Sequence, residues 1–142
     1  MWPCLIPVLL VGHIVTLQPN SSHISNVNGT QIEIQSCERG FGISGRAAPG
    51  PGLWGVGGQY GAEIYTDTTW SATFLTKIGL SYSDHSYPEL PMRGQFELGA
   101  QFIIGYEQLR FGVEWWHLSN AGLESPNIGL DMIVLQSGWA FE

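Results

Sequence analysis

The feature that most constrains this chain is a long alternation of apolar and polar residues with a period of two. The alternation runs through Trp54–Ile64, Trp70–Tyr82 and Gly94–Tyr106. Successive side chains of a β-strand point to opposite faces, so each run has one apolar face and one face of glycine and polar residues. These runs exceed the roughly five or six residues of a strand in a soluble protein and suit a tilted strand that crosses a membrane. The pattern therefore predicts a small antiparallel transmembrane β-barrel.

Composition agrees with a membrane barrel. Charged residues make up 12% of the chain, against about a quarter in a typical soluble domain. Hydrophobic residues make up 44% and aromatic residues 12%, and there are 19 glycines. No apolar run reaches the roughly 18 residues that a membrane-spanning helix needs. A water-soluble β-sandwich is the alternative that composition alone leaves open.

The number of strands follows less directly from the pattern. About six strands are clear, including Glu107–Asn120 and Ile128–Phe141, whereas closed membrane barrels have an even number and usually at least about eight. Either the missing strands come from the N-terminal third, or that region is incomplete. A short alternation covers Gln31–Ser36 there, and the Gly/Pro-rich stretch Gly45–Gly52 is expected to be a loop. We therefore expect an all-β barrel of about eight strands over residues 30–142.

The first residues of the chain, Met1–Leu17, include an apolar stretch about as long as the core of a secretory signal. No Lys or Arg precedes this stretch and no A-x-A-like cleavage site follows it. A divergent export signal, an incorrectly assigned start and a first strand all stay open as interpretations. We assign residues 1–22 to an export signal and linker.

Charge and cysteine content exclude several functions. The formal net charge of −7 argues against nucleic-acid binding, because no basic patch is present to neutralise phosphates. Cys4 and Cys37 do not form a disulfide framework, since Cys4 lies in the apolar start of the chain. No Cys/His cluster has the spacing of a metal site, so the residues imply neither a metal nor an organic cofactor.

The candidate chemistry lies near the C-terminus. His117 and Ser119 are in phase with the apolar residues of the run Leu109–Trp115, so they face lipid, where a polar pair is costly unless it has a function. Asp131 is in phase with the apolar residues of the next strand, and the connection between the strands brings it to the same end. Ser119 as nucleophile, His117 as general base and Asp131 as orienting acid make up an acyl-transfer triad.

A family resemblance becomes specific at these residues. The stretch His117-Leu118-Ser119-Asn120-Ala121-Gly122-Leu123, with Pro126–Asp131 after it, resembles the C-terminal signature of the lipid A 3-O-deacylase (PagL-type) family. The resemblance covers about Phe74–Phe141 and implies an eight-stranded outer-membrane barrel. It also implies the three triad roles given above and links Asn120 to oxyanion stabilisation.

Two details differ from the family pattern. The family's usual acid is Glu, whereas Asp131 is one methylene shorter. We therefore expect an enzyme whose activity is lowered or shifted but not abolished. Asn120 would point inward on an ideal strand, and oxyanion stabilisation would then need a local bend or its backbone N–H.

The function expected from the sequence is hydrolysis of the ester-linked 3-hydroxyacyl chain of lipid A by a serine esterase. The substrate would be lipopolysaccharide in the outer leaflet of a Gram-negative-type outer membrane, and a homodimer is left open. The alternative is a non-catalytic barrel with a structural, adhesive or narrow-pore role. A weaker third option, a soluble barrel that binds an apolar ligand inside, requires the apolar faces to point inward.

The remaining charged and aromatic residues near the motif are interpreted as structural. Glu97 and Glu114 are expected to point inward and to pair with Arg93 or Arg110 in the lumen. Trp115 is interpreted as a girdle or packing residue, with the lining of an acyl-chain groove as the alternative.

Overall fold

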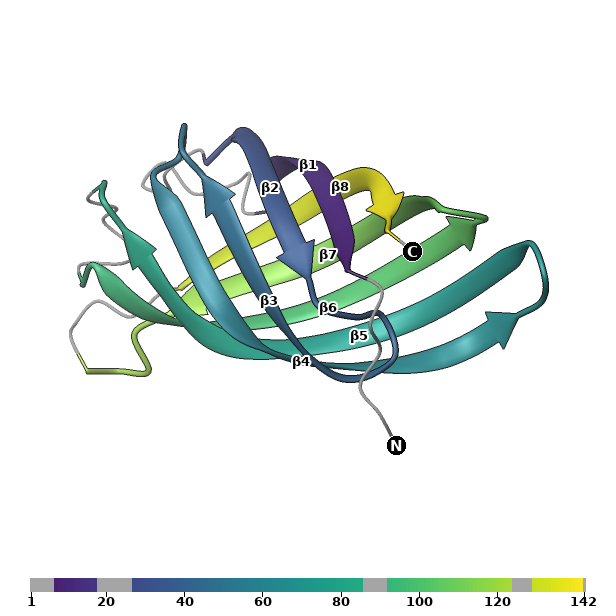
Figure 1. Cartoon of the computed structure of the whole chain (residues 1–142). Helices are drawn as coiled ribbons and strands as arrows, with labels where there is room; N and C mark the ends of the chain where they lie inside the picture. The colour runs from purple at the N-terminus through teal and green to yellow at the C-terminus, as the bar shows by residue number, and fades with distance from the viewer. Residues whose placement is uncertain (1–6, 18–26, 86–91, 124–128, 142) are drawn as a thin grey trace.

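The structure is a computed structural model that describes residues 7–17, 27–85, 92–123 and 129–141. In these residues eight strands form one closed antiparallel barrel, in which β1 pairs with β8 (Figure 1). The strands are β1 (Val8–Thr16), β2 (Gly29–Gln35), β3 (Gly40–Ala48), β4 (Leu53–Thr66), β5 (Trp70–Ser83), β6 (Gly94–Tyr106), β7 (Leu109–Ser119) and β8 (Leu130–Ala140). The predicted all-β barrel of about eight strands is confirmed. No helix in the described ranges is long and apolar enough to span a membrane.

Strand β1 lies inside the stretch that we assigned to an export signal and linker. It pairs along its length with β8 and over most of it with β2. The barrel therefore begins at Val8 rather than at residue 30, and the first-strand interpretation is the one that fits. The period-two pattern is hidden here because both faces of β1 are apolar. Leu10 and Ile14 are buried inside, whereas Val11 and Val15 are exposed on the outer wall.

The loop predicted over Gly45–Gly52 is wrong for residues 45–48, because strand β3 extends into it. The strand continues to Ala48, so the predicted loop is reduced to residues 49–52.

Glycine is tolerated within these strands because neighbouring backbones approach closely. Gly57 and Gly79 are cross-strand partners in β4 and β5, and a Cβ on Gly57 would lie 2.5 Å from the carbonyl oxygen of Ile78. No larger residue fits there without separating the two strands.

The outer wall carries the apolar faces of the strands. Large apolar side chains are exposed on all eight strands, among them Phe41, Val56, Ile78 and Leu135. Aromatic residues gather near strand ends: Trp54, Trp70, Tyr82, Tyr106, Trp139 and Phe141. An apolar wall with aromatic ends is the surface that a barrel presents to a bilayer. The option of a soluble barrel with its apolar faces inward is therefore wrong.

The lumen contains a network of charged side chains. Arg46 lies 2.8 Å from Glu114 and 3.7 Å from Glu97, and Lys77 pairs with Glu33 and, at 3.4 Å, with Glu114. All five side chains are at most 2% exposed. Glu97 and Glu114 do point inward, as predicted.

The predicted partners of those carboxylates were wrong. Arg110 pairs with Glu38 near the other end of β7, and Arg93 donates to the hydroxyl of Tyr82 on the exposed surface. Arg46 lies in the stretch that the sequence predicts to be a loop, and the structure places it in β3, where it pairs with both carboxylates.

Apolar side chains close the lumen on both sides of the charged network. One buried cluster includes Ile14, Leu53, Trp116, Leu118 and Met132. The other consists of Val8, Leu10, Leu75, Ile103 and Ala140. A lumen filled in this way argues against the narrow-pore alternative.

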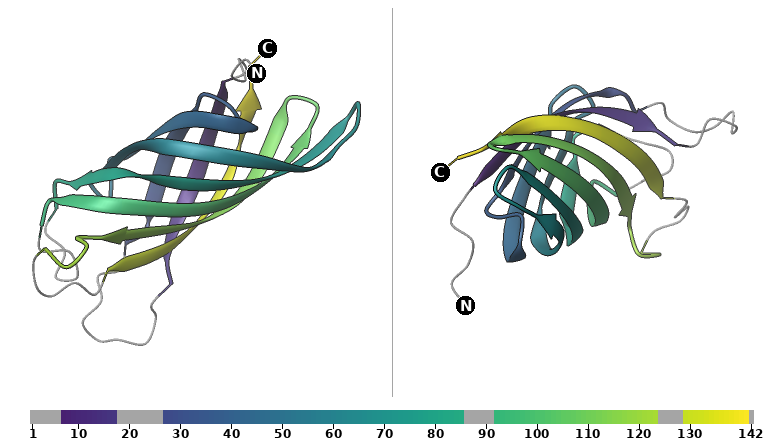
Figure 2. Two further views of the ribbon diagram at one scale, coloured as in Figure 1. Left: turned by 90° about the horizontal axis from the view of Figure 1, so that it is seen from below. Right: turned by 90° about the vertical axis from the view of Figure 1, so that its right-hand side faces the viewer.

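The two ends of the barrel differ in their connections. At the end that we call the short-turn end, strands are joined by residues 36–39, 67–69 and 107–108, β1 begins and β8 ends (Figure 2). At the opposite end, the long-connection end, the joining residues are 17–28, 49–52, 84–93 and 120–129. Strand β7 ends and β8 begins at the long-connection end, so the candidate residues lie there.

Candidate active site

His117 and Asp131 are paired across the last two strands of the barrel. They are direct cross-strand partners in β7 and β8, and Nδ1 of His117 lies 2.9 Å from Oδ1 of Asp131. Both face outward, with side chains 24% and 27% exposed. The sequence predicted that these two residues meet on the outer face, and the antiparallel register brings them into hydrogen-bonding contact.

A third side chain joins this pair. Nε1 of Trp115 donates a hydrogen bond of 2.9 Å to the same Oδ1 of Asp131. The Trp115 ring also stacks on the His117 ring, with centroids 5.6 Å apart and planes inclined by 24°. Sequence reasoning treated Trp115 as a girdle or packing residue and missed this contact. The available signal was its phase, because Trp115 is two residues from His117 on one face and diagonal to Asp131.

Ser119 is the last residue of β7 and is half-buried on the same face as His117. It lies opposite Phe96 of β6. No hydrogen bond joins Ser119 to His117 within the described part of the chain. Alternate residues of a strand are about 7 Å apart at Cα, so the two side chains must lean toward each other to react. Catalytic hydrogen bonds commonly tighten only when substrate is bound.

Asn120 points into the barrel, as its phase predicted, and is fully buried. Its Oδ1 accepts a hydrogen bond of 2.9 Å from the backbone N–H of Gly122, and its carbonyl accepts one of 3.1 Å from Leu123. Ala121 and Gly122 have φ angles of 54° and 77°, in the left-handed region. In this arrangement Asn120 shapes the turn that follows Ser119. Residues 126–128 of the motif lie outside the described residues.

Gly129 leaves room for the imidazole. Its φ of 78° is in the left-handed region that favours glycine. A Cβ at this position would lie 2.9 Å from Cε1 of His117 and 3.5 Å from Nε2. Any larger residue would displace the imidazole or the backbone that follows it. The close approach of the His117 imidazole therefore explains why the motif has a glycine at position 129.

The hydrogen bond to Asp131 determines what the imidazole can do. A neutral histidine that donates from Nδ1 to a carboxylate keeps a lone pair on Nε2. Nε2 can then accept a proton from a hydroxyl, and Asp131 stabilises the imidazolium that results. Within the described ranges no group of three or more His, Cys, Asp or Glu residues is arranged to hold a metal ion.

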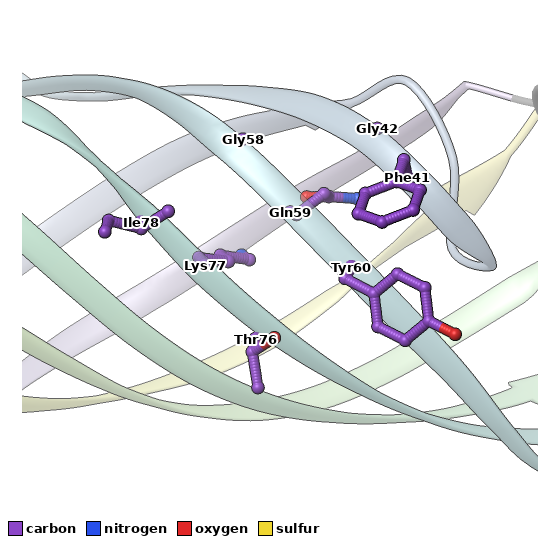
Figure 3. A pocket seen from close by; sticks show the side chains of 8 residues that line it. All are labelled: Phe41, Gly42, Gly58, Gln59, Tyr60, Thr76, Lys77 and Ile78. Carbon is purple, nitrogen blue, oxygen red and sulfur yellow. The ribbon is translucent and has the colours of Figure 1, made fainter.

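A groove of about 320 Å³ lies elsewhere on the outer wall, over β3, β4 and β5 (Figure 3). Its rims are Phe41, Tyr60 and Ile78, and Gly58, whose Cβ would have almost no neighbour within 4 Å, leaves the space between them. None of the candidate residues lines it. The groove is therefore separate from the candidate site.

Comparisons with known proteins agree with the fold and the motif. The barrel is similar to the Yersinia pestis outer membrane protein Ail, whose backbone structure was determined in a phospholipid bilayer nanodisc, with a TM-score of 0.53 and 11% sequence identity. The alignment covers 96% of this chain and 99% of that one, and at this identity it shows the fold alone.

The family comparison covers the residues of the site. No curated protein matches the sequence. The sequence model of the family described as lipid A 3-O-deacylase (PagL) matches residues 45–140, which is more than half of the chain and includes His117, Ser119 and Asp131. The chain therefore belongs to the lipid A 3-O-deacylase (PagL) family, and it is an integral β-barrel of the outer membrane.

Proposed function

We propose that this protein is a serine esterase that removes the 3-hydroxyacyl chain linked by an ester bond to the 3-position of lipid A. The observation that carries the proposal is the contact of 2.9 Å between His117 and Asp131, on the outward face that also bears Ser119. Three polar residues of this kind on a lipid-facing wall have little structural use and match the groups needed for ester hydrolysis. Membership of the deacylase family supports the same reaction.

The reaction would proceed through an acyl-enzyme. Oγ of Ser119 attacks the ester carbonyl while Nε2 of His117 takes the hydroxyl proton. The tetrahedral intermediate collapses, and the sugar oxygen leaves with the proton from His117. Water then attacks the acyl-serine with His117 again as base, which releases the 3-hydroxy fatty acid and restores the Ser119 hydroxyl. Asp131 keeps its negative charge throughout and stabilises the imidazolium.

The position of the site suits an outer-leaflet substrate. Outer-membrane barrels have short periplasmic turns and longer extracellular connections. By this rule the short-turn end faces the periplasm, and the triad at the long-connection end lies at the level of the outer leaflet. Because the triad faces outward, the ester of a neighbouring lipid would reach Ser119 by lateral diffusion in the membrane.

The test is mass spectrometry of lipid A after incubation with refolded protein in detergent or vesicles. The parent is expected to remove one 3-hydroxyacyl group, and Ser119→Ala and His117→Ala are expected to remove none. Ser137→Ala and His13→Ala serve as controls, since both residues are exposed on the outer wall away from the triad.

Folding of each variant is checked by its heat-dependent mobility on gels. Deacylation by Ser119→Ala at the parental rate would exclude this mechanism. A folded parent that leaves lipid A intact would favour the non-catalytic barrel.

A further inference from the structure

Resting on the proposed function, we propose that Trp115 is a positioning residue of the triad, which fixes the Asp131 carboxylate through its indole N–H. Both Trp115 Nε1 and His117 Nδ1 lie 2.9 Å from the same oxygen, Oδ1 of Asp131. A carboxylate held by one donor can rotate about its last bond. With two donors converging on one oxygen, the carboxylate has one preferred orientation.

The register of the strands explains how the indole reaches the carboxylate. Trp115 lies opposite Ile133, and Asp131 is the diagonal neighbour two residues away on β8. Diagonal neighbours in an antiparallel sheet are within reach of a large aromatic side chain. On the other side, Trp115 lies opposite the small residue Ala100 of β6.

The stacking contact adds a second constraint. The indole and the imidazole are nearly parallel, at 24° with centroids 5.6 Å apart. The Trp115 ring therefore limits the tilt of the His117 ring while its N–H limits the rotation of Asp131. Together these contacts favour the tautomer of His117 with its proton on Nδ1, which the proposed reaction requires.

The first experiment measures the tautomer without using activity. The ¹⁵N chemical shifts of the His117 imidazole report which nitrogen carries the proton, and the loss of a signal in His117→Ala assigns them. In the parent we expect a proton fixed on Nδ1. Trp115→Phe keeps an aromatic ring but removes the donor, and we expect a mixture of tautomers. Unchanged His117 shifts in Trp115→Phe would overturn the proposal.

Trp54→Phe is the matched control for the loss of an indole. Trp54 is 40% exposed on the outer wall at the long-connection end of β4, compared with 38% for Trp115. This variant should leave the His117 signals as they are in the parent. A change as large as that in Trp115→Phe would attribute the effect to general loss of an interfacial tryptophan and overturn the proposal.

The second experiment measures the consequence for catalysis. Loss of one positioning hydrogen bond should lower kcat about tenfold, with KM within about twofold of the parent. In an Asp131→Asn background the same substitution should have little further effect, because Trp115 acts through Asp131. A full tenfold loss in that background would overturn the proposal. A parent without deacylase activity would refute the proposed function, and in that case the imidazole signals would still test the positioning role.

Discussion

Two clusters of polar residues lie on opposite sides of the same sheet, and they are built differently. In the lumen, Arg46 and Lys77 contact three carboxylates, and every side chain is at most 2% exposed. On the outer face, His117 and Asp131 are about a quarter exposed and share a single tryptophan as a further partner. The lumen has more charge, and the outer face has the groups suited to ester chemistry.

The difference in burial and partners agrees with a structural role for the lumen cluster and with the catalytic role that we propose for the outer-face residues. Charges that pair with each other inside a closed lumen lower the cost of burying one another, and no substrate reaches them. Polar groups on a wall that faces lipid gain little from packing, and they remain accessible to an acyl ester. Substitutions in the lumen should therefore affect stability, whereas substitutions on the outer face should affect the reaction.

After the complete losses expected for Ser119→Ala and His117→Ala, the largest effect is expected for Asp131→Asn. The amide cannot stabilise the imidazolium of His117, so kcat should fall about 10³- to 10⁴-fold. The unfolding free energy in vesicles should stay close to that of the parent. The measurement combines lipid A mass spectrometry with urea titration. A variant that loses stability but keeps its activity per folded molecule would show that Asp131 has a structural role, like the carboxylates of the lumen.

Arg46→Met is the matching test in the lumen. Removing Arg46 leaves Glu97 and Glu114 buried with fewer counter-charges and should destabilise the barrel by about 3–5 kcal/mol. Arg39→Met is the control, because Arg39 is 61% exposed and its ion pair with Glu63 should contribute less than about 1 kcal/mol. Activity per folded molecule should be unchanged in both. A selective loss of activity in folded Arg46→Met would connect the lumen to the reaction.

Gly129→Ala tests whether the position of the His117 imidazole on the outer face limits the reaction. The added Cβ would press on Cε1 of His117, and a displaced imidazole should lower kcat about ten- to a hundredfold. Gly122→Ala is the control, since its φ of 77° is equally strained but its Cβ would meet nothing within 4 Å. Both should lose about 1 kcal/mol of stability from backbone strain. Equal activities in the two variants would count against a steric role for Gly129.

Asn120→Ala should have the smallest effect. Loss of the hydrogen bond from the Gly122 N–H, together with the other contacts of this buried side chain, should cost at least about 1 kcal/mol of stability and lower kcat by less than about tenfold. Single-turnover deacylation measures the change in the catalytic rate, and urea titration measures the change in the free energy of unfolding. A loss of activity as large as that of Ser119→Ala would instead give Asn120 the direct role in oxyanion stabilisation that the family resemblance implies.

Much of the fold was readable because strand periodicity is local. The alternation of β4 to β8 predicted which residues face lipid and which face the lumen, and the exposed and buried residues follow it except at the end of β4, where a register shift lies between Glu63 and Tyr65 and both faces are exposed. Strand β1 escaped prediction because its inner and outer residues are both apolar, so alternation leaves no trace in hydropathy. Arg46 was misplaced for a related reason, since glycines and prolines around it are typical of a loop.

Hydropathy along the chain was enough to predict the barrel, the outward phase of His117, Ser119 and Asp131, and the inward phase of Asn120 and Glu114, because side-chain direction on a strand depends only on position along it. The contacts between these groups came from the folded arrangement of the strands. The register between β7 and β8 set the contact of His117 with Asp131 and brought Trp115 to the same carboxylate. Closure of the sheet brought Arg46 from β3 to Glu114 on β7. These contacts depend on register and closure, which join residues far apart in the chain and which no local pattern encodes.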